Sequence, residues 1–170
     1  LSEGGTNIPS VSSTASGGAR LERLRVSFNA SDIKDGAAEI LQVGNGGSAP
    51  IIPLNFANGA AMPAIRISGT DYSTTAMVAN GTRTLIFMKS GSTTMSLTEG
   101  ERLLDAFRYR DDATLPTPGA RVLNVYAKDG AYESQATTFT VNAGFTPTIS
   151  QQPANSTIPT NGTATFTVGS

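Results

Sequence analysis

One stretch of the chain decides the fold: Arg121-Val-Leu-Asn-Val-Tyr-Ala-Lys-Asp-Gly130. Its first eight residues are rich in the β-branched and aromatic side chains that favour a strand. The Asp-Gly pair that follows is the best short hairpin signal in the chain, because such a pair accepts the positive φ angles of a tight turn. Residues 137–142 are the expected partner strand, with Phe139 and Val141 facing inward. The stretch therefore predicts an antiparallel sheet.

Alternating side chains predict more strands upstream of this hairpin. Leu24, Val26 and Phe28 alternate with polar residues, which is the period-two pattern of a half-buried strand. The apolar run 51–56 is interrupted by proline, which cannot donate to a ladder, so this run is expected to be an edge strand or an extended connection. Three further runs are predicted as strands: 38–43, 65–67 and 83–89, the last of them buried on both faces.

One short helix is expected among these strands. The sequence Thr98-Glu-Gly-Glu101 has the pattern of a capping box, in which the Thr oxygen accepts from an early backbone amide and the last Glu reaches back to the cap. Leu103, Leu104 and Phe107 then recur at helical spacing. The helix is therefore predicted over residues 99–109, inserted into a β domain that ends near residue 142.

Composition excludes much of enzyme chemistry. The 170 residues include no cysteine, histidine or tryptophan, so the chain has no Ser-His-Asp triad, cysteine nucleophile, imidazole base or Cys/His zinc site. Lys and Arg number 12 against 13 Asp and Glu, and a net charge of −1 provides no basic surface for nucleic acid. With 22 Thr, 17 Ser and 18 Gly but only 15% charged residues, the composition is typical of an extracellular β-rich protein, and we expect no enzyme.

Composition also predicts the boundaries of the chain's segments. Residues 1–20 are rich in Ser, Thr and Gly and are expected to be a leading linker or an edge segment. Residues 21–142 form the predicted β domain, residues 143–147 a linker, and residues 148–170 an incomplete further segment or donor strand. No apolar stretch approaches the roughly 18 residues that a membrane-spanning helix needs, so no membrane insertion is expected. The chain opens at Leu1 without a signal peptide, which suits a processed secreted protein or a fragment of a longer one.

The segment from Leu103 to Gly130 resembles the closing half of bacterial cadherin-like repeats, which are related to the proteoglycan-type repeats of giant surface adhesins. Those repeats run a short helix into an aromatic strand, then a turn rich in Asp, Asn and Pro, and then a strand that ends in Asp-Gly. The sequence Asp35-Gly-Ala-Ala-Glu-Ile-Leu41 is similar to their early turn and strand. The resemblance covers residues 21–142 and implies an all-β fold, an antiparallel β-sandwich of cadherin-like or Ig-like type.

Residues 147–168 resemble the first two strands of bacterial immunoglobulin-like repeats, which open with a Gln-Pro turn and continue into a Thr-Ala-x-Phe-x-Val strand. Two strands cannot bury a core alone, so this segment needs a partner surface. Together the resemblances imply an extracellular spacer or adhesion module, strung in tandem on the bacterial cell surface and often stiffened by calcium. Family members commonly carry an acidic cluster before the first long strand, whereas here Glu22 is the only acid between Ser16 and Arg23.

Calcium is the one cofactor that the sequence suggests. Asp111 and Asp112 are adjacent acids in a predicted loop, and Asp105 precedes them by one to two helical turns. Because a calcium ion takes six to eight oxygen ligands from carboxylates and nearby carbonyls, these three aspartates are the candidate site. The alternative is a solvated turn in which the Asp side chains bond to their own backbone.

The sequence leaves three functions open. The first is a non-enzymatic structural or adhesion module whose partners are neighbouring repeats. The second is a self-assembling filament or surface-layer subunit, whose tail adds a strand to an identical subunit through Ile149, Phe166 and Val168. The third is a carbohydrate-binding module that binds surface glycans on a tyrosine platform, for which the chain offers Tyr72, Tyr109, Tyr126 and Tyr132.

Overall fold

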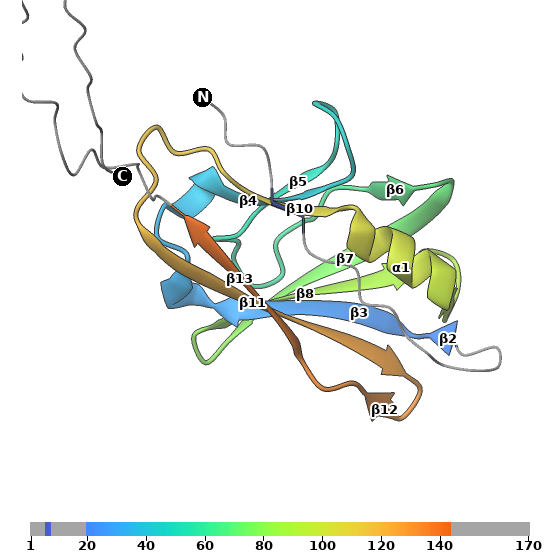
Figure 1. The fold of residues 1–170 in the computed structure, drawn as a ribbon. Helices are drawn as coiled ribbons and strands as arrows, with labels where there is room; N and C mark the ends of the chain where they lie inside the picture. Colours follow the sequence, from blue (N-terminus) through green and yellow to red (C-terminus); the bar gives the residue numbers. More distant parts are fainter. Residues whose placement is uncertain (1–5, 8–19, 144–170) are drawn as a thin grey trace, which may run out of the picture.

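The computed structural model describes residues 6–7 and 20–143, which form two larger antiparallel sheets, a two-stranded ladder and one short α-helix (Figure 1). The smaller of these sheets has four strands in the order β1-β10-β4-β5. The larger has seven, in the order β12-β11-β3-β8-β7-β6 with β13 also paired to β11, and β2 pairs with β9. The strands are β1 (Thr6–Asn7), β2 (Arg20–Leu21), β3 (Arg23–Asn29), β4 (Glu39–Val43), β5 (Ile51–Pro53), β6 (Ile65–Ile67), β7 (Thr70–Ala79), β8 (Thr82–Lys89), β9 (Met95–Ser96), β10 (Phe107–Asp111), β11 (Gly119–Asp129), β12 (Tyr132–Glu133) and β13 (Thr137–Ala143). The helices are α1 (Leu97–Asp105) and the 3-10 turns η1 (Ala30–Asp32) and η2 (Gly36–Ala38).

Both larger sheets bury one face in a common hydrophobic core. From the larger sheet, Val26 on β3 and Phe87 on β8 are fully buried, and from the smaller sheet Leu41 on β4 and Phe107 on β10 are fully buried in the same cluster. The rings of Phe87 and Phe107 lie 4.8 Å apart between their centroids, so side chains of the two sheets touch. Because each such side chain contributes about 2 kcal/mol on burial, this shared core holds the sheets face to face. The predicted all-β antiparallel sandwich with one short helix is therefore confirmed.

The helix begins two residues earlier than the sequence pattern indicates. Ser96 is the N-cap: its hydroxyl accepts from the backbone N–H of Glu99 at 3.2 Å, and the Glu99 carboxylate accepts from the Ser96 N–H at 2.8 Å. The capping box predicted on Thr98 and Glu101 is therefore wrong by two positions. Both windows fit the same pattern, but Glu99 is also held by the Nζ of Lys89 at 2.7 Å, which favours the earlier one.

The helix also ends earlier than predicted, at Asp105 rather than near Tyr109. The next residues form β10, in which Phe107 pairs with Val43 and Tyr109 with Leu41. Both aromatic side chains are buried, while the arginines that alternate with them are half-buried on the other side of the strand. Phe107 fits helical spacing as well as this period of two, and the sequence alone assigned it to the helix.

The remaining strand predictions are confirmed with small changes. Strands lie at 23–29, 39–43, 65–67 and 82–89, and β5 is the edge strand that its prolines favour. The Asp129-Gly130 turn is present, with Gly130 at a φ of 53°, but its immediate partner is the two-residue β12, and β13 pairs with the first half of β11. The prediction that β8 is buried on both faces is wrong: Leu85 and Phe87 bury one face, and the other face is only half-buried.

The ten-residue strand β7 was not predicted from the sequence. It is rich in Ser and Thr, and only Tyr72 and Ala76 among its residues are buried, so its apolar alternation is weak. The turn that joins β7 to β8 is formed by Asn80 and Gly81, whose φ angles of 49° and 74° are those of a tight hairpin turn. This Asn-Gly pair is a hairpin signal comparable to Asp129-Gly130.

The predicted segment boundaries fall partly on the described residues. Thr6 and Asn7, in the expected leading segment, pair with Tyr109 and Arg108 of β10. Ala143 is the last residue of β13, and the rest of the expected linker 143–147 and the segment 148–170 lie outside the described residues. No helix in the described part of the chain is long and apolar enough to cross a membrane.

The position of the capping box can be tested with one pair of alanine variants. Ser96→Ala removes the side chain that accepts from the Glu99 N–H, so it is expected to lower the free energy of unfolding by about 1 kcal/mol. Thr98→Ala changes an exposed residue of the first helical turn and is expected to have little effect. Urea unfolding measures both, and a larger loss for Thr98→Ala would contradict the observed cap.

Candidate functional site: a buried arginine–carboxylate cluster

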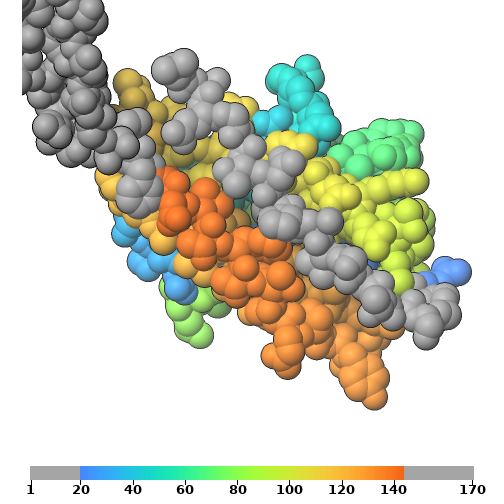
Figure 2. Space-filling model, in the orientation of Figure 1, coloured from blue at the N-terminus to red at the C-terminus, as the bar shows by residue number. Residues whose placement is uncertain are grey.

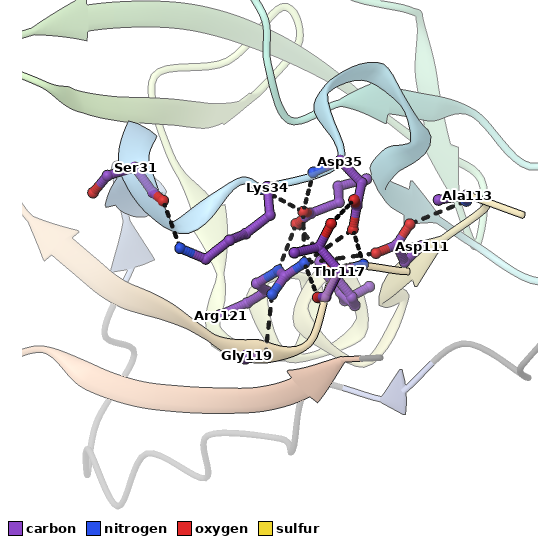
Figure 3. Close-up of polar contacts among 10 residues, drawn as sticks. Ser31, Lys34, Asp35, Asp111, Ala113, Thr117, Gly119 and Arg121 are labelled. Atoms are coloured by element: carbon purple, nitrogen blue, oxygen red, sulfur yellow. Dashed lines mark hydrogen bonds and ion pairs between the residues drawn. The ribbon is translucent and has the colours of Figure 1, made fainter. Parts of the chain in front are cut away.

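Arg121 is the residue around which the candidate site is built (Figure 3). It lies on β11 in the larger sheet, and its exposed fraction is 0%. Its Nε and Nη2 donate to the two carboxylate oxygens of Glu39, on β4 in the smaller sheet, at 3.0 and 2.9 Å. Glu39 is also fully buried. This bidentate ion pair therefore joins the two sheets through the interior. Bidentate pairing with a carboxylate is among the strongest hydrogen-bonding geometries of arginine.

Arg121 also holds the connection between β10 and β11 through further hydrogen bonds. Nη2 also donates to Asp35 Oδ2 at 3.1 Å and to the carbonyl of Thr117 at 3.0 Å, and Nη1 donates to the carbonyl of Gly119 at 3.1 Å. Asp35 in turn accepts from both the backbone N–H and the hydroxyl of Thr117. Burial opposes the charge on Arg121, but the bonds and charge of Glu39 outweigh it, and the pKa of Arg121 is raised above its ordinary value.

Glu39 accepts from three groups besides Arg121. Its Oε1 accepts from the backbone N–H groups of Lys34 and Asp35 at 2.6 and 2.9 Å, and its Oε2 accepts from the hydroxyl of Tyr109 at 2.8 Å. Burial, followed by the bond to Glu39, raises the pKa of Tyr109 well above its ordinary value, so this phenol stays neutral and donating. The carboxylate of Glu39 is therefore fully used by contacts within the protein.

Asp111 is the member of the cluster whose bonding is incomplete. Its side chain is 6% exposed; Oδ1 accepts from the backbone N–H of Ala113 at 3.1 Å, while Oδ2 has no hydrogen-bond partner among the described residues and lies 3.8 Å from Nη2 of Arg121. Burial raises the pKa of Asp111 to about 6, and the neighbouring Asp35 and Glu39 push it the same way. For Asp35, burial also opposes ionisation, but the bonds from Thr117 and the charge of Arg121 outweigh it and lower the pKa. As the pH falls, Asp111 therefore takes up a proton before Asp35 does.

The structure does not bring the three aspartates predicted for calcium together. Asp105 ends α1 and Asp111 ends β10, so a strand of roughly 13 Å separates the two. Asp112 is half-exposed and accepts from the guanidinium of Arg110, with the shortest contact at 2.7 Å. Asp105 instead lines an open cleft of about 480 Å³ together with Arg66 and Arg102.

Asp111 meets a different pair of acids, Asp35 and Glu39. One oxygen from each of the three lies within 4.8 Å of the others, which is the spacing of a cation site. The cation at this place is the guanidinium of Arg121, which bonds to two of the three carboxylates. Calcium needs six to eight oxygens, and in the described cluster Oδ2 of Asp111 is the only carboxylate oxygen without a bond. The geometry therefore fits a structural ion-pair cluster better than a metal site.

Sequence reasoning missed Arg121, Glu39 and Asp35 as members of one site. Arg121 and Glu39 are 82 positions apart, so no local spacing could join them. A signal was nevertheless present, because Arg121, Leu123 and Val125 alternate on the inward face of β11. A charged residue in an apolar register is paired when it is buried, and this pattern would have predicted a buried acidic partner.

The comparisons with known proteins give no identity to this site. No protein family, curated protein or solved structure matches the chain. What is established is a mostly-β antiparallel fold with one short helix and a buried charge cluster between its sheets.

The raised pKa of Asp111 predicts an unusual dependence of stability on pH. Because the folded pKa of about 6 lies above the ordinary 3.8, the folded state binds this proton more tightly, and the resulting stability is complete below about pH 4 and lost as the pH rises through 6. Linkage gives a loss of about 1–1.5 kcal/mol between pH 5 and 7.5. The chain has no histidine, so none of its side chains has an ordinary pKa that lies inside this range.

Asp111→Asn removes this titration. We expect the variant to unfold at a nearly constant urea concentration between about pH 5 and 7.5 and to be more stable than the wild type at the upper end. Asp112→Asn is the matched control, because that side chain is half-exposed and should keep the wild-type slope. A wild-type slope in Asp111→Asn would show that another group carries the pH dependence.

Proposed function

We propose that this chain is a non-enzymatic, extracellular structural module of a bacterial surface or secreted protein, which transmits tension between its neighbours. The observation that carries the proposal is where the longer described stretch, residues 20–143, begins and ends. Arg20 begins β2, just before β3, and Ala143 ends β13. Figure 1 places β2 and the tip of β13 at opposite ends of the molecule.

The strands between these two points are arranged to resist tension. β3 and β13 lie on the two sides of β11, and both run antiparallel to it. Arg23 lies opposite Lys128 near one end of β11, and Ala143 lies opposite Gly119 at the other end. Tension between the two ends therefore runs along the strands. For the strands to slide apart, many ladder hydrogen bonds must break at the same time instead of one after another.

The buried charge cluster supports the same role. Arg121 lies opposite Val141 of β13, close to the point where the chain leaves the sheet, and it ties β11 to β4 in the other sheet. Sliding of β11 would break this ion pair in the interior, where an unpaired charge is costly. The buried bonds within the cluster support a non-enzymatic role, because they use its charged side chains within the protein.

Composition and resemblance support the proposed location and partners. The chain lacks cysteine and relies on Ser, Thr and Gly for its polar surface, as proteins exported by bacteria often do. The likeness of residues 21–142 to cadherin-like repeats of surface adhesins suggests neighbouring repeats as partners. An adhesion role is part of the same proposal, with the described domain acting as the spacer.

The sequence leaves two other functions open. The filament alternative depends on Ile149, Phe166 and Val168, which lie outside the described residues. The glycan alternative depended on a tyrosine platform, and the described tyrosines do not form one. Tyr72 and Tyr109 are buried, the ring of Tyr126 is covered by the guanidinium of Arg25 at 3.8 Å, and Tyr132 is 83% exposed on β12, so nothing described here favours tyrosine stacking on a sugar.

Single-molecule pulling tests the structural role, and the absence of native cysteine allows the points of attachment to be chosen. Handles on Arg20→Cys and Asn142→Cys load the sheet along its strands, whereas handles on Arg20→Cys and Tyr132→Cys, near one end of β11, peel β3 from β11. All three positions are exposed. We expect a clearly higher unfolding force for the first pair, because its ladders break together.

Both double-cysteine chains must show the wild-type melting temperature before their unfolding forces are compared. Equal forces, or a lower force for the Arg20 and Asn142 attachment, would contradict a module built to transmit tension.

A further inference from the structure

β13 forms a long edge of the larger sheet that carries neither charge nor proline. It is the outermost strand beside β11, and its other side pairs with no described strand. It has seven residues, none of them charged and none of them proline. Such an edge is open to the addition of another strand, which is why proteins usually guard their edges with charge, proline or short length. In Figure 2, β13 lies at the surface on the visible face, in orange and orange-red.

The other sheet edges in the described residues are guarded. The edge strands β1, β5 and β6 have only two or three residues each, and β5 ends in Pro53. Beyond β6 the outer side of β7 is covered by a loop: the N–H of Gly59 donates to the carbonyl of Ala76 at 3.0 Å, and Asn58 Oδ1 accepts from the N–H of Val78 at 3.0 Å. β13 is therefore the long edge that the described part of the chain leaves open.

The inward face of β13 is also incompletely covered. Phe139 and Val141 pack against the hydrophobic core but are only half-buried. Thr138 and Thr140, which alternate with them, point outward and are exposed. A further strand beside β13 would cover the open flank of the two apolar side chains.

The chain contains a second copy of the β13 motif. Thr138-Phe-Thr-Val141 is repeated as Thr165-Phe-Thr-Val168. Because strand side chains alternate between faces, a strand over residues 163–168 would place Phe166 and Val168 on one face with Thr on the other. This is the same pattern that β13 presents to the core.

We propose that residues 163–168 of the same chain add as a strand to the free edge of β13, with Phe166 and Val168 beside Phe139 and Val141. The 19 residues between Ala143 and Thr163 can reach up to roughly 60 Å, whereas β13 is about 20 Å long. A tether of this kind raises the effective concentration to the order of millimolar. In dilute solution the chain's own segment therefore outcompetes the same segment of a second copy.

Strand addition would supply main-chain hydrogen bonds for affinity and apolar contacts for register. The inference deepens the proposed structural role, and its mechanical meaning rests on that role. The pairing would fix the direction in which the chain leaves the domain. Tension would then enter a strand that is bonded to the sheet. The same contact made between two copies would generate the filament alternative.

Amide hydrogen exchange on the full chain, read residue by residue by NMR, tests the proposal. In an edge strand only alternate backbone amides donate to the neighbouring strand. The remaining amides of β13 point within the sheet away from β11, and we call them the outward set; they are protected only if another strand is added. We expect both sets to exchange slowly in the wild type. In Phe166→Asp we expect the outward set to exchange at least tenfold faster, while the set that faces β11 stays protected and shows that the domain is folded. Fast exchange of the outward set in the wild type would overturn the proposal.

A matched pair of lysine variants locates the contact. Thr140→Lys places a charge on the open edge and is expected to expose the outward amides of β13 as Phe166→Asp does. Thr75→Lys makes the same change at an exposed position of β7, whose edge is covered, and is expected to leave them protected. Equal effects of the two lysines would overturn the assignment to β13.

A mixing experiment identifies which copy donates the strand. Isotope-labelled Phe166→Asp is mixed with unlabelled wild type at micromolar concentration, and light scattering gives the mass. We expect the labelled outward amides to stay exposed and the mass to be that of a monomer. Restored protection with a larger mass would overturn the proposal, because it would show that a second copy of the chain donates the strand. None of these results depends on the pulling experiment, so failure of the proposed function and failure of this inference are distinguishable.

Discussion

The ion pair between Arg121 and Glu39 is the contact on which the rest of the structure depends. Apolar burial holds the two sheets together, but it has no preferred direction and would tolerate a shift of one sheet against the other. A guanidinium that meets both oxygens of a carboxylate at 3.0 and 2.9 Å permits one alignment of β11 against β4. Such a pair adds little net stability, because both charges lose their water, but the loss of either partner leaves a costly charge in the core. We infer that it sets the register between the sheets.

Several local features follow from this pair. The hydroxyl of Tyr109 and the backbone of Lys34 complete the shell around Glu39, which fixes β10 and the turn before β4. The carbonyls of Thr117 and Gly119 complete the shell around Arg121, which fixes the connection into β11. The cost appears at Asp111, which has no bond for one buried oxygen and therefore holds its proton to an unusually high pH. An ion-pair network that ties β11 in place near its N-terminal end is also what a tension-transmitting sheet requires.

The fold was predictable where one face of a strand is apolar and the other polar. β3 was predicted on this basis, and the prolines at positions 50 and 53 correctly marked β5 as an edge. β7 was missed because a Ser/Thr-rich strand can be stabilised by neighbours on both sides without a strong apolar pattern of its own. The helix bounds were displaced because Ser96 and Thr98 both fit a capping box and Phe107 fits two periods, and tertiary contacts decide between them. Of the charge cluster, only Asp111 was among the predicted calcium ligands, since its partners come from distant parts of the sequence.

The most direct test of this account is the urea unfolding of Arg121→Met beside Arg66→Met. Arg121 is fully buried, whereas Arg66 makes an ion pair whose partners are both more than half exposed. Arg121→Met is expected to lose about 3–5 kcal/mol because Glu39 is left buried without a counter-charge, whereas Arg66→Met is expected to change little. Adding Glu39→Met to Arg121→Met is expected to restore part of the loss, because it removes the unpaired charge but not the unpaired backbone groups around it. Equal stability of the two single variants would contradict the claim that the Arg121–Glu39 pair holds the sheets in register.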